Sequence, residues 1–326
     1  MRALHRVMVT SLFTAGVVAV AAPAFAQNYP TKYVRIITGN PGSMTDIVTR
    51  QLAQRLGERW SQSVVVENQG GAGITVGTGL AARSTPDGYT LLLADRTSIA
   101  VAPNLHKSLP YDPVRDLAPI SLVAVAPQLL VAHPSVPAAN LREFIDYAKQ
   151  RPGAIDYASA GPGTAIHITG ELLKQVAGID MVAIQYKGGG AAMIAIVSGE
   201  AKAGFGLMPV ALPHVRAGKV KAYAITSTKR FAGTPDIPTV IEAGLPGFGS
   251  EYYWIGMFAP ARTPPALVAK LNRDIVEILQ APALQTALLA QGAEPSPGSP
   301  AEFAAFIKSE IAKLKNVIEI AGIKVE

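Results

Sequence analysis

Hydrophobic residues recur along this chain in two alternating patterns, short apolar runs and stripes with a helical period. Val34–Thr38 and Thr90–Ala94 are runs of the first kind, and the second of them is typical of a strand buried on both faces of a parallel sheet. Between these runs, Val48, Leu52 and Leu56 recur at the spacing of one helix face. Strand and helix patterns alternate along most of the chain, which predicts an α/β fold with parallel sheets.

The alternation occurs in two series that are joined by extended segments. After the first series, Ile120–Ala126 and Gln128–Ala132 are extended runs broken by Pro127, and they predict a crossing between two domains. After the second series, the extended run Tyr252–Ala259 predicts the return crossing, and the chain ends in helical patterns. We therefore expect domain 1 to comprise residues 27–126 and 254–326, and domain 2 to comprise residues 127–253.

Two strand-to-helix turns of small residues are the most informative local features. Gly39–Met44 precedes a helix that begins at Thr45 or Asp46, and Ala160–Gly163 precedes a helix capped by Thr164. The buried stripe of that second helix is expected at Ile166, Gly170, Leu173 and Ala177. Free backbone N–H groups at the start of a helix favour an anion, so each turn predicts an anion-binding seat. Because parallel sheets bind ligands at the carboxyl ends of their strands, the two seats are expected to face each other across a cleft.

A third strand end adds candidate ligand-binding side chains. Arg96, Thr97 and Ser98 follow the Thr90–Ala94 run and are expected at the same cleft. A guanidinium can bind a carboxylate through two hydrogen bonds, so Arg96 is a candidate partner for a second carboxylate of the ligand. The alternative is that Arg96 pairs with Asp95 or with solvent.

An aromatic cluster lies at the return crossing. Tyr252, Tyr253 and Trp254 either flank an aromatic or extended ligand or pack at the hinge between the domains.

The first residues have the pattern of a secretory signal peptide. Basic residues precede an apolar run from Val7 to Ala22, and Ala24-Phe25-Ala26 fits a cleavage site of small residues. The run is too short to form a stable membrane span. We expect residues 1–26 to be removed on export, leaving a free periplasmic protein that begins at Gln27.

Composition excludes several kinds of chemistry. The chain contains no cysteine, which excludes disulfides, thiolate metal sites, a cysteine nucleophile and a lipid-anchored cysteine. The formal charge of +6 falls to +4 without Arg2 and Arg6, and no basic run with interleaved aromatic residues is present. We therefore expect no nucleic-acid partner.

No catalytic or metal-binding arrangement stands out. The histidines that follow the signal segment, His106, His133, His167 and His214, form no pair at metal-binding spacing, and no cofactor fingerprint occurs. Ser159, His167 and Asp156 are close in sequence, but the chain lacks a Gly-x-Ser-x-Gly elbow. His167 is expected in the first helical turn, where it supports the loop or points into the cleft as a neutral donor.

A series of short motifs runs in order through the chain. They are Tyr29-Pro30, Thr45-Asp46-Ile47-Val48, Val64-Val65-Val66-Glu67-Asn68, Pro86-Asp87-Gly88-Tyr89-Thr90, Leu109-Pro110-Tyr111-Asp112-Pro113, Tyr157-Ala158-Ser159-Ala160-Gly161, Gly170-Glu171-Leu172, Tyr186-Lys187-Gly188, Leu212-Pro213-His214, Pro238-Thr239-Val240-Ile241-Glu242-Ala243-Gly244 and Phe258-Ala259-Pro260. In this order the motifs resemble the Bug-type periplasmic solute-binding proteins, the receptors of tripartite tricarboxylate transporters.

The resemblance implies a two-domain type II periplasmic-binding fold that closes on a ligand in the cleft between its domains. It also implies a small carboxylic acid as ligand, held by loop N–H groups and ordered waters rather than by an arginine clamp. No cofactor is expected, and the implied partners are the permease subunits of a tripartite transporter.

The resemblance also places candidate ligand-binding residues by position. The first binding loop contributes Asn40, Gly42, Ser43, Met44, Thr45 and Asp46, and the second contributes Ala160, Gly161, Gly163, Thr164, Ala165 and His167. The resemblance places Tyr186, Gly188, Gly206 and Met208 on the far side of the site. The other candidates, Arg96, Thr97 and Ser98 at the third strand end and Trp254 at the return crossing, come from the residues themselves.

This chain departs from the family pattern at several of these positions. Its first loop has Asn40, Ser43 and Met44 where the family is richer in proline and glycine. Gly206 stands where an acidic residue is frequent, and Arg96 stands where small residues are common.

The favoured function is capture of a small mono- or dicarboxylate, aliphatic or aromatic, by domain closure, followed by delivery to a membrane permease. A sensory receptor for a membrane histidine kinase would use the same closure and is the main alternative. A hydrolase or lyase on this fold is disfavoured because no nucleophile–base pair is evident.

Overall fold

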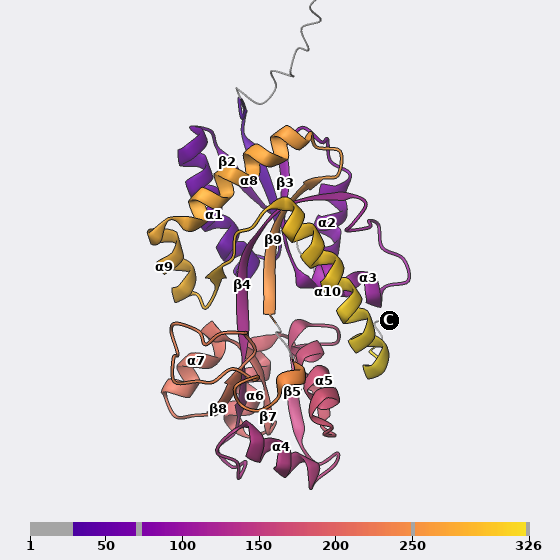
Figure 1. Ribbon diagram of the computed structural model, residues 1–326, viewed down its shortest axis with the longest axis vertical. Coiled ribbons are helices and arrows are strands. Elements are labelled where there is room, and N and C mark those ends of the chain that lie inside the picture. Colours follow the sequence, from indigo (N-terminus) through magenta and orange to yellow (C-terminus); the bar gives the residue numbers. More distant parts are fainter. Residues whose placement is uncertain (1–28, 70–73, 249–251, 324–326) are drawn as a thin grey trace, which may run out of the picture.

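The computed structural model describes residues 29–69, 74–248 and 252–323. The predicted signal peptide lies outside the described residues. Within those three ranges, no helix has both the length and the apolar character required to cross a membrane. The described strands form one mixed sheet in the order β2-β1-β3-β9-β4-β7-β5-β6, with β8 and β10 also paired to β4 (Figure 1).

The first group of strands contains the parallel set β2, β1 and β3, extended by antiparallel pairing of β3 with β9 and of β9 with β4. Its elements are β1 (Val34–Thr38), α1 (Met44–Trp60), β2 (Val64–Asn68), α2 (Thr75–Ala82), β3 (Thr90–Asp95), the π-helical turn η3 (Thr97–Val101), α3 (Ala102–Leu105), β9 (Tyr252–Pro260), α8 (Pro265–Gln280), α9 (Pro282–Ala290), β10 (Glu294–Pro295) and α10 (Pro300–Ala321).

The second group contains the parallel set β6, β5 and β7, with β7 and β8 both antiparallel to β4. Its elements are α4 (Leu141–Lys149), β5 (Asp156–Ser159), α5 (Ala165–Ala177), β6 (Val182–Gln185), α6 (Gly189–Ser198), β7 (Ala203–Leu207), α7 (Met208–Arg216), β8 (Lys221–Ile225) and the 3₁₀ turn η4 (Pro246–Phe248).

One long strand, β4 (Leu117–Ala132), joins the two groups and runs through both parts of the molecule (Figure 1). The sequence predicts two runs broken by Pro127, but the strand is continuous. Pro127 pairs with Tyr252 at the start of β9, whereas Gln128 begins the pairing with β7. The missing N–H of Pro127 therefore falls where β4 changes partner and does not end the strand.

Three apolar clusters hold the helices on the sheet. The α1 stripe Val48, Leu52 and Leu56 packs with Ile36 of β1 and with α8 residues in one cluster. A second cluster contains the predicted α5 residues Ile166, Leu173 and Ala177 and extends to α4 and α10. A third lies under α6 and α7. Gly170, the remaining member of the predicted α5 stripe, is also buried.

Most predicted elements occur within a few residues of their expected bounds, because their start and stop signals are local. Thr164 caps α5, and Ser299 with Glu302 forms the capping box of α10. Helix α9 and the turn η3 were not predicted. The C-terminal helix α10 packs against η3 and also contacts α5 of the second group (Figure 1).

Candidate functional site

The register of the sheet brings the carboxyl ends of the two parallel sets toward each other. β3 ends at Asp95, which pairs with Ile255 of β9, and Ile255 pairs in turn with Ala124 of β4. The end of β3 therefore lies at the level of Ala124. β7 runs in the opposite direction and ends at Leu207, which pairs with Gln128 of β4. Only four residues of β4, about 13 Å of strand, separate these two levels. Both predicted anion-binding turns follow strands that end at this interval, where α/β sheets bind their ligands.

The β1–α1 and β5–α5 turns have the same backbone construction, although they belong to different strand groups. Each contains Pro-Gly-Ser/Thr, with the glycine at positive φ, +75° for Gly42 and +71° for Gly163. The caps Ser43 and Thr164 have ψ values of 161° and 160°. Their N–H groups donate to the carbonyls three residues earlier, at 3.1 and 3.3 Å. The Pro-Gly-Ser/Thr sequence shared by the two turns indicates their common backbone conformation, and it was not used in the prediction from sequence.

The shared construction extends to the residue three positions after the cap. The Gly42 N–H donates to Asp46 Oδ2 at 2.9 Å, and the Gly163 N–H donates to His167 Nδ1 at 3.1 Å. The N–H groups of Asp46 and His167 in turn donate to the cap hydroxyls, at 3.2 and 3.4 Å. Each turn is thus held in shape by hydrogen bonds to its own side chains.

The N–H groups that follow each cap are the ones available to a ligand. Among the described residues, no acceptor bonds the N–H of Met44 or Thr45 in α1, or of Ala165 or Ile166 in α5. These groups lie at the positive ends of two helices of 17 and 13 residues. Two such ends at one sheet interval can hold one carboxylate each.

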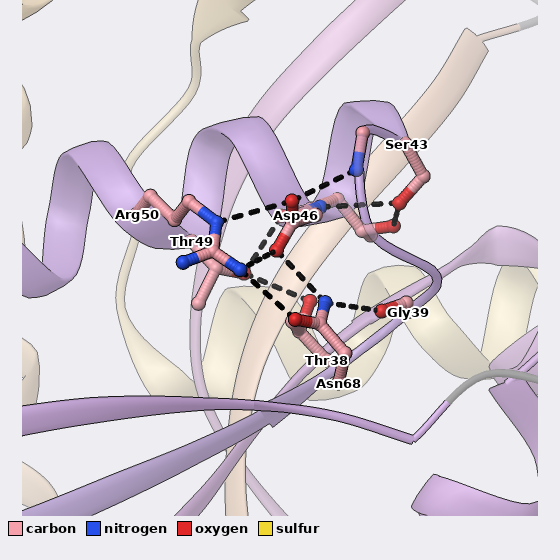
Figure 2. Close-up of polar contacts among 9 residues, drawn as sticks. Thr38, Gly39, Ser43, Asp46, Thr49, Arg50 and Asn68 are labelled. Atoms are coloured by element: carbon pink, nitrogen blue, oxygen red, sulfur yellow. Dashed lines mark hydrogen bonds and ion pairs between the residues drawn. The ribbon is translucent and has the colours of Figure 1, made fainter.

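Asp46 is committed to the first turn and does not present a free carboxylate. Arg50 donates to Asp46 Oδ2 at 3.1 Å and Asn68 donates to Asp46 Oδ1 at 2.8 Å, while Asn68 also donates to the Gly39 carbonyl (Figure 2). Burial raises the pKa of Asp46, but the hydrogen bonds from Arg50, Asn68 and the Gly42 N–H outweigh it and lower the pKa overall. The carboxylate therefore stays ionised and holds the turn to β2.

His167 plays the corresponding part in the second turn as a neutral acceptor. Its ring is buried, and burial lowers its pKa, with Lys174 acting in the same direction and Glu171 opposing them. An Nδ1 that accepts from the Gly163 N–H requires its lone pair, so the bond exists only in the unprotonated form. Of the two roles predicted for His167, the structure supports the one that stabilises the loop.

Stability is expected to fall as the pH decreases below about 6.5, and to fall less in His167→Gln. The pKa of His167 is lower in the folded chain, so the unfolded chain binds more protons in this range and stability rises with pH. The contribution is complete above the unfolded pKa and is lost as the pH falls through the folded pKa. Urea unfolding of both proteins between pH 8 and pH 5 measures the difference; parallel curves would contradict this role for His167.

A hydroxyl chain connects the first turn to the end of β3. Ser43 Oγ and Thr45 Oγ1 are 2.9 Å apart, the Thr45 side chain hydrogen-bonds the Tyr253 hydroxyl, and that hydroxyl donates to Asp95 Oδ2 at 2.6 Å. Asp95 Oδ1 accepts the Thr97 N–H at 2.9 Å. Burial raises the pKa of Asp95, partly offset by these hydrogen bonds. Asp95 was not predicted as part of the site, because its hydrogen bond to Tyr253 joins residues far apart in the chain.

The start of α6 lies beside the second turn. Gly188, with φ +94°, precedes α6, and its N–H donates to the Ala160 carbonyl at 3.2 Å. The hydroxyl of Tyr186 donates to Glu200 Oε1 at 3.0 Å. Gly188, which was predicted on the far side of the site, thus lies beside Ala160 of the second turn, and the Tyr186 side chain already has a partner within the protein.

Arg96 and Trp254 both have an exposed fraction of 0%, and both bond the same carboxylate. Arg96 Nε donates to Glu310 Oε2 at 3.0 Å, and Trp254 Nε1 donates to the same oxygen at 3.1 Å. The Trp254 ring also packs edge-on against Phe303 and Phe306. Arg96 thus pairs with Glu310, and the Arg96 and Trp254 side chains both serve to attach α10.

Gly206 and Met208 are also packed inside the protein. A Cβ on Gly206 would lie 2.5 Å from Met193 Cε and 3.0 Å from Ala211 Cβ, so this position has no room for an acidic side chain. Met208 is 1% exposed and belongs to the cluster under α6 and α7. Thr97 and Ser98 use their N–H groups on Asp95.

The described residues assemble no metal or catalytic centre that we can identify. No group of three or more metal-ligating side chains occurs in that part of the chain. Ser159 Oγ donates to the Gly161 carbonyl at 3.4 Å, while His167 Nδ1 accepts from Gly163, so the Ser–His–Asp arrangement considered from sequence does not form.

Comparison with known proteins gives a consistent picture. Residues 48–323 match the sequence model of the tripartite tricarboxylate transporter family receptor. The protein BugT of Bordetella pertussis is 37% identical over 315 residues, which cover 96% of this chain and 95% of BugT.

Several solved structures that are at least 30% identical have the same fold. Rpa4515 of Rhodopseudomonas palustris with adipate has a TM-score of 0.79 at 30% identity, covering 91% of this chain and 99% of that one. MatC (Rpa3494) of the same organism with bound malate has a TM-score of 0.74 at 32% identity, covering 89% and 100%. The periplasmic binding protein BugD has a TM-score of 0.75 at 34% identity, covering 91% and 100%. The predicted two-domain periplasmic-binding fold is confirmed.

Proposed function

Because the chain belongs to the tripartite tricarboxylate transporter receptor family, a family of solute-binding receptors and not of enzymes, we propose that it captures a small organic carboxylate in the periplasm and delivers it to a tripartite transporter. The observation that carries the proposal is the pair of matching Pro-Gly-Ser/Thr turns, each with two N–H groups that no described residue bonds. Adipate and malate, found in two structural neighbours, are both dicarboxylates.

The proposed ligand contacts follow from the two turns. One carboxylate is bound by the N–H groups of Met44 and Thr45, and another by those of Ala165 and Ile166. The residues of the two loops and the start of α6 at Gly188 form the rest of the site. We leave four candidates out of the contacts. Arg96 and Trp254 bond Glu310, Met208 packs in the cluster under α6 and α7, and Gly206 has no room for a side chain.

Binding is proposed to act through domain closure. In this proposal residues 27–126 and 254–326 form one domain, residues 127–253 form the other, and β4 and β9 connect them. A ligand that bonds both turns has more contacts in the closed state, and this difference in affinity shifts the population toward closure. The closed form is what the transporter would recognise. Neither the matched family nor BugT, BugD, Rpa4515 or MatC is described as a sensor, so nothing favours the histidine-kinase alternative.

The test is a thermal-shift titration of the chain from Gln27 with aliphatic, hydroxylated, aromatic and amino-substituted acids. A ligand that binds only the folded protein stabilises it by about 2.7 kcal/mol at 100 times its Kd. We expect a saturable rise in Tm for one class of carboxylate, without turnover of that compound. Absence of any rise across the panel would contradict the proposal.

Ala165→Pro tests the N–H contacts directly. Ala165 is the first helical residue of α5, where proline is well tolerated, and Thr164 already has the extended backbone that precedes proline. The same cap conformation precedes Pro300 in α10. The variant removes one N–H that we assign to the ligand, so affinity should fall at least tenfold while Tm without ligand stays close to the wild type. Unchanged affinity would exclude this contact.

A further inference from the structure

Gln128 lies on β4 where the strand passes from one ligand-binding turn to the other. Ala124 and Ala126 precede it on the same face of β4, in the cluster that contains the α1 stripe. Ala126 pairs with Tyr253, whose hydroxyl bonds Asp95 at the first turn. Gln128 itself bonds Thr169, in the helix that follows the second turn. The side chain therefore projects on the face shared by α1 and α5, between their N-termini.

Hydrogen bonds fix the orientation of the Gln128 amide. Its Nε2 donates to Thr169 Oγ1 at 2.8 Å, and the Thr169 hydroxyl donates to the Ala165 carbonyl at 2.7 Å. Because that hydroxyl uses its proton on Ala165, its oxygen can only accept, and the amide cannot be rotated to exchange oxygen and nitrogen. The backbone of Gln128 is held by Thr226 through both its N–H and its carbonyl.

The remaining polar atom of this side chain, Oε1, has no hydrogen-bond donor among the described residues, although Gln128 is 0% exposed. Buried polar atoms are nearly always hydrogen-bonded, so an acceptor left open at a binding site calls for a donor from outside the protein. The site lacks a described carboxylate for an ammonium ion: Asp46 is bonded by Arg50 and Asn68, and Asp95 by Tyr253 and Thr97. A neutral amide oxygen without a nearby free charge suits a neutral O–H donor.

We propose that Gln128 is a specificity-determining residue that accepts a hydrogen bond from a hydroxyl of the ligand, so that the preferred substrate is a hydroxycarboxylic acid. The inference rests on the proposed carboxylate-binding function. The two turns bind carboxylate whether or not a hydroxyl is present, and Gln128 then distinguishes a hydroxy acid from its deoxy analogue.

Matched ligand pairs separate this inference from the proposed function. Affinities of the wild type are measured by calorimetry for malate and succinate, 2-hydroxyglutarate and glutarate, and mandelate and phenylacetate. We expect the hydroxylated member of the pair that fits the site to bind at least tenfold more tightly. Gln128→Met, similar in length but without the amide, should reduce that ratio to about one while leaving the deoxy acid bound as in the wild type. Aspartate serves as the ammonium counterpart of malate.

Each outcome has a defined meaning. Binding of deoxy and hydroxy acids with equal affinity would overturn the role of Gln128 but leave the carboxylate receptor intact, and so would a preference that persists in Gln128→Met. A preference for aspartate over malate would overturn the hydroxyl assignment. If the wild type binds none of these acids, both proposals are refuted. If Gln128→Met unfolds, Thr169→Val removes the group that orients the amide and should likewise lower the hydroxy-to-deoxy ratio.

Discussion

Replacing Glu310 by alanine is expected to lower the free energy of unfolding by about 3–5 kcal/mol, because it removes one partner of a buried ion pair. Glu310 Oε2 accepts from Arg96 Nε at 3.0 Å and from Trp254 Nε1 at 3.1 Å, and Lys313 Nζ lies 3.8 Å from Oε1. The Arg96 side chain is completely buried, so its charge cannot regain water when this carboxylate is removed. The loss should loosen α10 from β9 and η3.

Urea unfolding measures this effect, and α10 offers a matched control. Glu319 is an exposed acid on the same helix, paired with Lys315 at 3.9 Å. Glu319→Ala should change stability by less than about 0.5 kcal/mol, as exposed pairs contribute little. Glu310→Gln keeps an acceptor of similar shape and should fall between the two. If Glu310→Ala were as stable as Glu319→Ala, the buried pair would not be what attaches α10.

Gly170→Ala is expected to destabilise the protein by about 1–3 kcal/mol, although alanine normally favours a helix over glycine. A Cβ at Gly170 would overlap the Tyr157 ring, with Cζ at 2.7 Å. That ring cannot move aside easily, because its hydroxyl donates to Glu171 at 2.7 Å. Helix α5 would have to shift away from β5. Since α5 carries Thr164 and the second turn, affinity for the carboxylate should fall as well.

Gly190→Ala provides the comparison for this substitution. Gly190 is also in a helix, α6, and within the described residues no atom outside its own helical turn lies within 4 Å of the position that its Cβ would take. Its replacement should leave stability unchanged or raise it slightly. Chemical denaturation and a carboxylate titration of both variants test the expectation. Equal stability of Gly170→Ala and Gly190→Ala would show that α5 is not packed against Tyr157 as described.

Much of the fold could be predicted from the sequence because its signals are local. Runs such as Thr90–Ala94 and the stripe Val48, Leu52 and Leu56 specify element type by their period alone. Thr164 marks a helix start because a cap bonds a residue only three positions away. The positions of the two strand-to-helix turns could be predicted for the same reason.

The tertiary structure alone decided which side chains remain available to a ligand. From sequence, Arg96 at a strand end is equally suited to a ligand carboxylate or to a protein partner, and its actual partner Glu310 is 214 residues away. Gln128 was not a candidate from sequence. An acceptor without a hydrogen-bond donor can be recognised only when the positions of all neighbouring donors are known. Local patterns determine where helices begin and strands end. Which side chains bond one another depends on contacts between distant segments, and these contacts exist only once β4, β9 and α10 have packed together.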